Sequence, residues 1–110
     1  MANKVKTLDE SLRGKVSSII ARGTIDKPMD WDTILGSGIY TVMLDNCSTS
    51  LNMPSGISWI YGVLEVINPG VSYYAIQRLT SHDCEIWQRI RKGSGWSAWV
   101  KLSATTVGGG

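Results

Sequence analysis

Asp30 and Asp32 are the first residues in this sequence whose spacing could support catalysis, because they flank Trp31. Two carboxylates beside an aromatic ring would suit a glycosidase. That chemistry, however, needs two carboxyl groups on opposite sides of a bound sugar, roughly 5–10 Å apart. Carboxylates two residues apart in a segment that contains Gly and Pro more commonly cap turns or face solvent. We therefore interpret the chain as non-enzymatic, with no catalytic residue.

A second cluster, His82-Asp83-Cys84, combines residue types that bind metals. A structural zinc site needs about four ligands, and only Cys47, far away in the sequence, could add to this set. His82 is the only histidine, so the residues suggest no catalytic triad. We expect an exposed hairpin turn, no cofactor and no metal; an ion on the axis of a trimer, with one His per subunit, is the alternative. Gly36-Ser37-Gly38 lacks the strand–loop–helix context of a phosphate-binding loop.

The aromatic residues are the strongest candidates for binding. Trp87 is predicted to share a strand face with Arg89 and Arg91, while Trp99 and Tyr74 each belong to a pair of rings that a strand would separate onto opposite faces. An exposed ring beside charged groups can serve as a platform for a sugar. The alternative is that these rings form the core and a trimer interface, where Trp, Tyr and Arg are enriched. The candidate glycan-binding residues are Trp87, Arg89, Arg91, Trp99 and Tyr74.

The N-terminal segment has the pattern of an amphipathic helix. Thr7-Leu8-Asp9-Glu10 matches a capping box, which favours a helix start. Glycine commonly follows the last residue of a helix, and Gly23 fits this position. The pattern therefore predicts a helix over about residues 7–22. Such a helix is marginal alone and must dock its apolar stripe. The pattern leaves open whether it docks on its own β domain or on two copies of itself. The candidate oligomer-interface residues are Leu8, Leu12, Val16 and Ile19.

The rest of the chain predicts an antiparallel β-meander, so the fold class is mainly β with an N-terminal α-helix. A connector over 24–38, anchored by Trp31, Ile34 and Leu35, precedes the first strand, and a long loop over 45–58 follows it. Short connections between the later strands imply antiparallel neighbours, and Gly62 suggests a bulge. The expected strands cover 39–44, 59–67, 71–80, 84–91 and 96–102. The domains are then a helix (1–23), a β domain (24–102) and a flexible tail (103–110).

Composition excludes several functions. The net charge is +2 without a dense basic stripe, which disfavours nucleic-acid binding. The N-terminus lacks the apolar run of a secretory signal, and no stretch approaches the ~18 apolar residues of a membrane span. Cys47 and Cys84 are expected to be unpaired and mostly buried, in a protein made in a reducing cytosol. Charged residues make up only 18% while there are five Trp and four Tyr, which suggests surface that a subunit or partner covers.

Over residues 30–102 the sequence resembles the pyocin-knob type of module found in phage tail fibres and contractile-bacteriocin fibres. The motifs that carry the resemblance are Gly38-Ile39-Tyr40, Pro54–Gly56, Gly62–Val66, Gln77-Arg78, Arg89-Ile90-Arg91 and the Trp-Ser-x-Trp-x-Lys pattern of Trp96–Lys101.

The resemblance implies a structural component of a virion fibre: a homotrimer that is made in the host cytoplasm, resides on the virion and contacts other phage virion proteins. The helix would then mediate trimerisation or attachment. Recognition of a host cell-surface polysaccharide is the alternative function. A long fibre would continue on both sides of such a module. We therefore expect a short separate fibre protein, a head or baseplate decoration, or a fragment.

Overall fold

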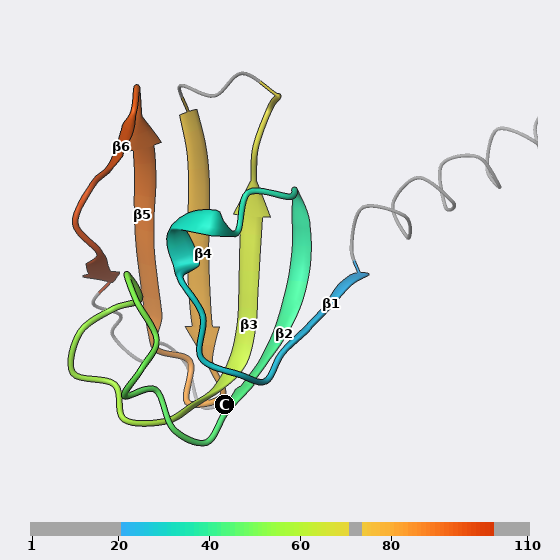
Figure 1. Cartoon of the computed structure of the whole chain (residues 1–110), viewed down its shortest axis with the longest axis vertical. Helices are drawn as coiled ribbons and strands as arrows, with labels where there is room; N and C mark the ends of the chain where they lie inside the picture. The colour runs from blue at the N-terminus through green and yellow to red at the C-terminus, as the bar shows by residue number, and fades with distance from the viewer. Residues whose placement is uncertain (1–20, 71–73, 103–110) are drawn as a thin grey trace, which may run out of the picture.

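The computed structural model describes residues 21–70 and 74–102. These residues form one seven-stranded sheet in the order β1-β2-β3-β4-β5-β6, with β7 also paired to β5 (Figure 1). A 3-10 helix, η1, covers Trp31–Thr33. The strands are β1 (Ala21–Ile25), β2 (Gly38–Leu44), β3 (Ile60–Ile67), β4 (Tyr74–Ser81), β5 (Ile86–Lys92), β6 (Gly95–Trp96) and β7 (Val100–Leu102).

The antiparallel meander predicted for the centre of the chain is confirmed. Strands β2 to β5 pair with their sequence neighbours in antiparallel register. The bulge expected at Gly62 is wrong, because Val42, Gly62 and Ser81 lie in one continuous register across three strands. Gly62 has another role. A Cβ at this position would lie 2.0 Å from the carbonyl oxygen of Thr80, so only glycine lets β3 and β4 approach this closely.

The first described element corrects the predicted helix end. Residues 21 and 22 belong to β1, so the helix predicted over about residues 7–22 does not extend to residue 22. Strand β1 pairs with β2 in parallel, with Gly23 opposite Tyr40 and Ile25 opposite Val42. The β-branched Thr24 and Ile25 favour an extended chain, and the crossover through η1 returns the chain to a parallel neighbour. Residues 1–20, which hold the four predicted interface residues Leu8, Leu12, Val16 and Ile19, lie outside the described residues, as does the tail 103–110.

The last predicted strand, 96–102, is interrupted. Strand β6 ends at Trp96, and β7 begins at Val100. Between them the Ser97 hydroxyl accepts the amide of Ile90 at 3.0 Å, and the Ser97 amide donates to the Ile90 carbonyl at 2.8 Å. The side chain of Ser97 thus replaces one backbone partner of β5. The irregular backbone here places Trp99 against the core.

One face of the sheet is covered and holds the core. Helix η1 and the long loop after β2 lie over this face, toward the viewer in Figure 1. Trp31 is fully buried between these layers, and Ile34 is 4% exposed, which confirms two of the predicted anchors. The other core residues are Ile25, Val42, Leu44, Cys47, Ile60, Leu64, Val66 and Leu79.

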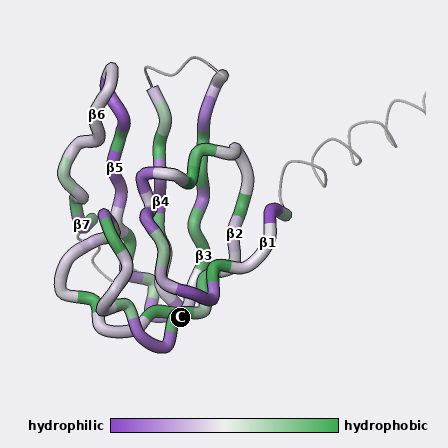
Figure 2. Tube along the Cα trace, in the orientation of Figure 1, coloured by the Kyte–Doolittle hydropathy of each residue, from purple (hydrophilic) through white to green (hydrophobic). Residues whose placement is uncertain are grey.

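The other face, which we call the open face, is uncovered by the described residues and is rich in apolar side chains. Both hydrophobic and hydrophilic residues occur along the central strands (Figure 2), and neighbouring apolar residues such as Val63 and Leu64 in β3 place apolar side chains on both faces of the sheet. Strand parity and cross-strand pairing place seven of the ten large exposed hydrophobic residues on the open face. They are Met43, Tyr61, Val63, Ile67, Tyr74, Val100 and Leu102.

Candidate functional site

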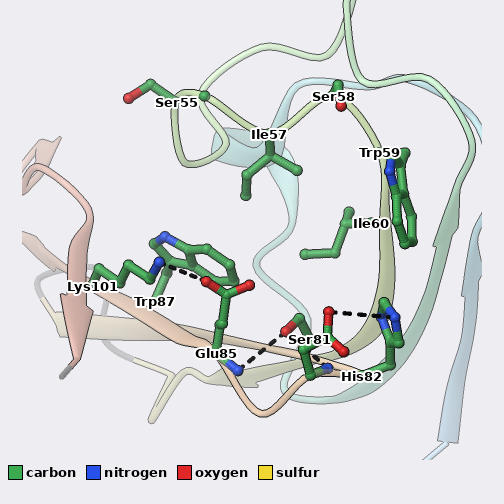
Figure 3. Close-up of a pocket in the computed structure, with 12 residues that line it drawn as sticks. Ser55, Ile57, Ser58, Trp59, Ile60, Ser81, His82, Glu85, Trp87 and Lys101 are labelled. Carbon is green, nitrogen blue, oxygen red and sulfur yellow. Dashed lines mark hydrogen bonds and ion pairs between the residues drawn. The ribbon is translucent and has the colours of Figure 1, made fainter. Parts of the chain in front are cut away.

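A pocket of about 340 Å³ lies at the end of the sheet where β4 turns into β5 (Figure 3). Its upper wall is the segment 55–59, and its lower wall is the turn from Ser81 to Glu85. Ile60 at the start of β3, Trp87 from β5 and Lys101 from β7 complete the lining. This volume is at the small end of the range for ligand pockets, which is roughly 300–1,000 Å³. We call it the β4–β5 pocket.

The lower wall of the β4–β5 pocket is fixed by one hydroxyl. Ser81 Oγ accepts the backbone amides of Asp83 at 3.2 Å and Glu85 at 3.1 Å. The Ser81 amide in turn donates to the Glu85 carbonyl at 2.9 Å. Cys84 has a φ of 64°, a left-handed conformation that closes the tight turn. These bonds hold the Glu85 backbone in place at the pocket rim.

Charged groups lie directly beside an indole in the β4–β5 pocket. Lys101 Nζ lies 2.6 Å from Glu85 Oε2 and 5.4 Å from the centre of the Trp87 ring. Trp87 is partly buried, and part of its side chain packs against the core. Lys101 and Glu85 keep about half of their side-chain surface exposed. The pocket therefore presents a donor, an acceptor and an aromatic surface within a few ångströms.

A second aromatic group lies at the other end of the pocket. The rings of Trp59 and His82 are 5.3 Å apart with an interplanar angle of 33°, and Trp59 meets Tyr61 edge to face at 5.4 Å. His82 Nε2 lies 3.5 Å from an Asp83 carboxylate oxygen. The Tyr61 hydroxyl donates to Asp45, and this bond together with the negative charge of Asp45 raises the pKa of Tyr61. His82 thus occupies an exposed turn, as predicted.

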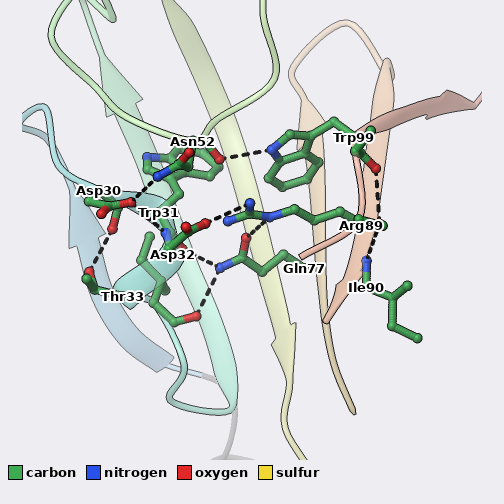
Figure 4. A network of polar contacts seen from close by, with 12 residues as sticks. Asp30, Trp31, Asp32, Thr33, Asn52, Gln77, Arg89, Ile90 and Trp99 are labelled. Carbon is green, nitrogen blue, oxygen red and sulfur yellow. Dashed lines mark hydrogen bonds and ion pairs between the residues drawn. The ribbon is translucent and has the colours of Figure 1, made fainter. Parts of the chain in front are cut away.

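Arg89 belongs instead to a buried network that joins the sheet to the covering layer (Figure 4). Its Nε donates to Gln77 Oε1 at 2.8 Å, and its Nη1 lies 2.9 Å from Asp32 Oδ1. The guanidinium carbon lies 4.2 Å from the ring centre of Trp96 and 4.8 Å from that of Trp99. Burial lowers the pKa of Arg89, while the Asp32 carboxylate acts in the opposite direction.

The acidic pair around Trp31 serves the same network. Asp30 Oδ1 accepts the Asp32 amide at 3.0 Å and the Asn52 side-chain amide at 2.8 Å, so it caps η1 and fixes the long loop. These two bonds, the Asn52 bond foremost, lower the pKa of Asp30. The Trp99 indole donates to the Asn52 carbonyl at 3.0 Å. Both carboxylates therefore have structural partners, which accords with the turn-capping interpretation.

The structure separates the five residues predicted to bind a glycan. Trp87 lines the β4–β5 pocket. Arg89 is only 5% exposed, and Trp99 packs beside it in the network of Figure 4. Arg91 shares the covered face but pairs with Trp96 at the far end of β5. Tyr74 lies on the open face, so these five side chains do not converge on one site.

Sequence reasoning missed most of the pocket. Glu85 and Lys101 are 16 residues apart, and they meet because Trp87 and Lys101 are opposite each other in the β5–β7 pair. A regular hairpin continued from the Arg91–Trp96 pair would place Val100 opposite Trp87, so alternation alone does not predict this register; the irregular residues 97–99 shift it by one. The wall at 55–59 comes from a long loop whose path has no periodic signal. The signal for Lys101 was its place in the Trp-Ser-x-Trp-x-Lys pattern.

The described part of the chain contains no candidate metal cluster and no candidate membrane-spanning helix. Within residues 21–70 and 74–102, no group of three or more His, Cys, Asp or Glu side chains could hold a metal ion. The same residues contain no helix long and apolar enough to span a bilayer. Both thiols are free, as predicted. Cys47 is buried, and this burial raises the pKa of its thiol. Cys84 is exposed, so the prediction of burial is confirmed for Cys47 and wrong for Cys84.

Comparison with known proteins finds a match in structure. No family model matches the sequence, and no curated protein matches it. The fold is similar to that of the fibre of the Pseudomonas aeruginosa R1 pyocin, in a structure comprising C-terminal residues 323–701, with a TM-score of 0.67 and 15% sequence identity. The match covers 81% of this chain and 24% of the pyocin chain, so this chain corresponds to about a quarter of that fragment. The similarity establishes a fibre-like β fold.

Proposed function

We propose that this protein is a structural, non-enzymatic module of a phage or contractile-bacteriocin fibre that works as a homotrimer on the particle. The observation that carries the proposal is the shared fold with the R1 pyocin fibre over 81% of this chain. The resemblance of residues 30–102 to the pyocin-knob module also supports the proposal, because it rests on sequence motifs and not on the comparison of structures. The Trp-Ser-x-Trp-x-Lys motif contains Trp96 of β6, Ser97 with its hydrogen bond to Ile90, and the first two residues of β7. The motif therefore coincides with defined structural elements.

The open face supports self-association. Soluble monomers seldom expose large contiguous apolar patches, and here seven large apolar residues share one side of the sheet. Glu65 and Arg78 pair across strands in the middle of this face, and they provide opposite charges that a second copy can complement. The occupant that we propose for the open face is another copy of the chain. The N-terminal residues Leu8, Leu12, Val16 and Ile19 remain proposed contributors to the same trimer.

A second candidate function is recognition of a host-surface glycan. The observation that favours it is the β4–β5 pocket, which combines the Trp87 indole with a Glu85–Lys101 ion pair. Trimeric display would multiply a weak affinity at single sites. In such a trimer the open face assembles the module, whereas Trp87 and Lys101 of the pocket lie on the covered-face side of β5 and β7.

Light scattering on the full chain tests the primary proposal. A mass near three times 12.0 kDa supports it, and a monomer at physiological concentration contradicts it. Leu12→Asp and Ile19→Asp in the full chain then assign the roles. Loss of the trimer in both variants would place the essential contacts in the N-terminal segment. A trimer that persists in both would assign them to the β domain.

A further inference from the structure

We propose that the β4–β5 pocket binds a neutral saccharide, with the Trp87 indole as the stacking surface and the Glu85–Lys101 pair as the group that bonds to hydroxyls. This inference deepens the second candidate function and rests on it, because it names the ligand class and the residues. It does not require that the fibre proposal be correct.

The first argument is the pairing of a donor and an acceptor beside a ring. A sugar hydroxyl both donates and accepts, so adjacent hydroxyls are complemented by a cation and a carboxylate next to each other. Lys101 and Glu85 provide this arrangement at 2.6 Å. The ammonium has three donors, of which Glu85 takes one. Lys101 Nζ lies over the Trp87 ring, 5.4 Å from its centre, so a sugar that packs against the accessible part of the indole would have its hydroxyls close to both charges.

The second argument is that the pocket is pre-formed. Ser81 Oγ fixes the backbone at Asp83 and Glu85, while Trp87 is held by its core contacts. The opposite wall carries the hydroxyls of Ser55 and Ser58 around Ile57 (Figure 3). A site that is already ordered loses less conformational entropy when a ligand binds.

The third argument selects neutral over acidic ligands. The pocket is lined by two carboxylates, Asp83 and Glu85; Glu85 already pairs with the single lysine, and Asp83 lies 3.5 Å from the His82 imidazole. A uronate or phosphate entering this pocket would meet like charge and would have to compete with Glu85 for Lys101. A purely apolar ligand would remove these charges from water without compensation. A neutral sugar ring avoids the repulsion that an acidic ligand would meet, and its hydroxyls keep the charged groups of the pocket hydrogen-bonded.

Nuclear magnetic resonance on the full chain provides the test. We expect glucose, galactose or N-acetylglucosamine, titrated to millimolar concentrations, to shift the Trp87 indole and the amides of Glu85 and Lys101. Glucuronate and glucose 6-phosphate should bind at least roughly tenfold more weakly than the best neutral sugar. The proposal is overturned if no neutral sugar shifts these signals, or if the acidic sugars bind equally well.

Substitutions in the pocket show whether its side chains bind the sugar. Trp87→Leu should abolish the shifts, but it also removes core contacts. Glu85→Gln and Lys101→Met change exposed groups and should weaken binding roughly five- to tenfold while the fold persists. Lys92→Met, at the opposite end of β5, is the matched control and should leave affinity unchanged. Unchanged affinity in both Glu85→Gln and Lys101→Met would refute the site.

An array of bacterial polysaccharides, probed with the full chain, distinguishes failure of the site from failure of the function. Binding that is lost in Lys101→Met but kept in Lys92→Met supports both. Binding that both variants keep would refute this pocket while leaving glycan recognition in place. Binding to no polysaccharide, together with no shift by any monosaccharide, would refute the second candidate function itself.

Discussion

Arg89 Nε donates to Gln77 Oε1 at 2.8 Å, and this bond joins two buried polar side chains of neighbouring strands, each of which also contacts the layer that covers the sheet. Gln77 Nε2 uses both of its hydrogens, donating to the carbonyls of Trp31 at 2.8 Å and Ile34 at 3.0 Å. Arg89 reaches Asp32 in the same layer. Gln77 thus supplies a partner to the Ile34 carbonyl and a second partner to the Trp31 carbonyl, which also accepts the Ile34 amide at 3.3 Å.

We expect Arg89→Met to destabilise the protein by about 3 kcal/mol. The substitution leaves Gln77 Oε1 and Asp32 without their cation, and breaking a buried pair typically costs ~3–5 kcal/mol; Asp32 is 41% exposed, which places the cost at the lower end. Arg22→Met makes the same chemical change at an exposed position on β1 and should cost less than about 1 kcal/mol. Urea unfolding of both variants measures the difference; equal losses would show that the Arg89 network contributes nothing specific.

Gly62→Ala should be among the most damaging small substitutions in the chain. The added methyl group would meet the Thr80 carbonyl at 2.0 Å, and because the obstacle is backbone, β3 and β4 must move apart. We expect a loss of about 2–3 kcal/mol in the free energy of unfolding. Gly95→Ala is the control, since a Cβ there has no neighbour within 4 Å. Thermal unfolding of the two variants checks this, and a Gly62→Ala protein as stable as Gly95→Ala would contradict the described strand packing.

The stability contributed by Asp30 should depend on pH. Its hydrogen bonds from Asn52 and from the Asp32 amide lower its pKa below the ordinary value of 3.8. This contribution is therefore present above pH 3.8 and is lost as the pH falls through the lower pKa of the folded state. Asp30→Asn should melt below the wild type at neutral pH, and the gap should narrow in acid. Melting curves from pH 7 down to 2 test this, with the exposed Asp26→Asn as a control for net charge; a gap that widens in acid would contradict the assignment.

Self-association should depend on the open face and not on exposed apolar residues in general. Ile67 is 56% exposed on the open face, and Leu51 is 58% exposed on the loop over the opposite side. Because their exposure matches, Ile67→Glu and Leu51→Glu add the same charge to equally accessible sites. We expect Ile67→Glu to lower the mass in light scattering and Leu51→Glu to leave it unchanged. An unchanged mass in both variants would remove Ile67 from the interface.

The sequence by itself determined the central meander, because alternation, β-branched residues and the turn at Asn68–Gly70 act locally. It also identified the buried anchors Trp31 and Ile34 and the fibre-like class of fold. It placed Arg89 on the same strand face as Trp87, and the structure agrees. Alternation alone, however, does not say which face of a strand becomes buried when both faces carry apolar and charged residues.

Only the tertiary structure decided the remaining points. Strand β1 is parallel because a long crossover brings it to the edge of β2, and nothing local to Ala21–Ile25 encodes that partner. Arg89, one of the residues predicted to bind a ligand, is only 5% exposed because η1 and the long loop cover that face of the sheet. The β4–β5 pocket joins residues from the loop, the turn and β7, and such convergence depends on chain paths that carry no periodic pattern. Local patterns fix elements, whereas their packing fixes which side chains meet.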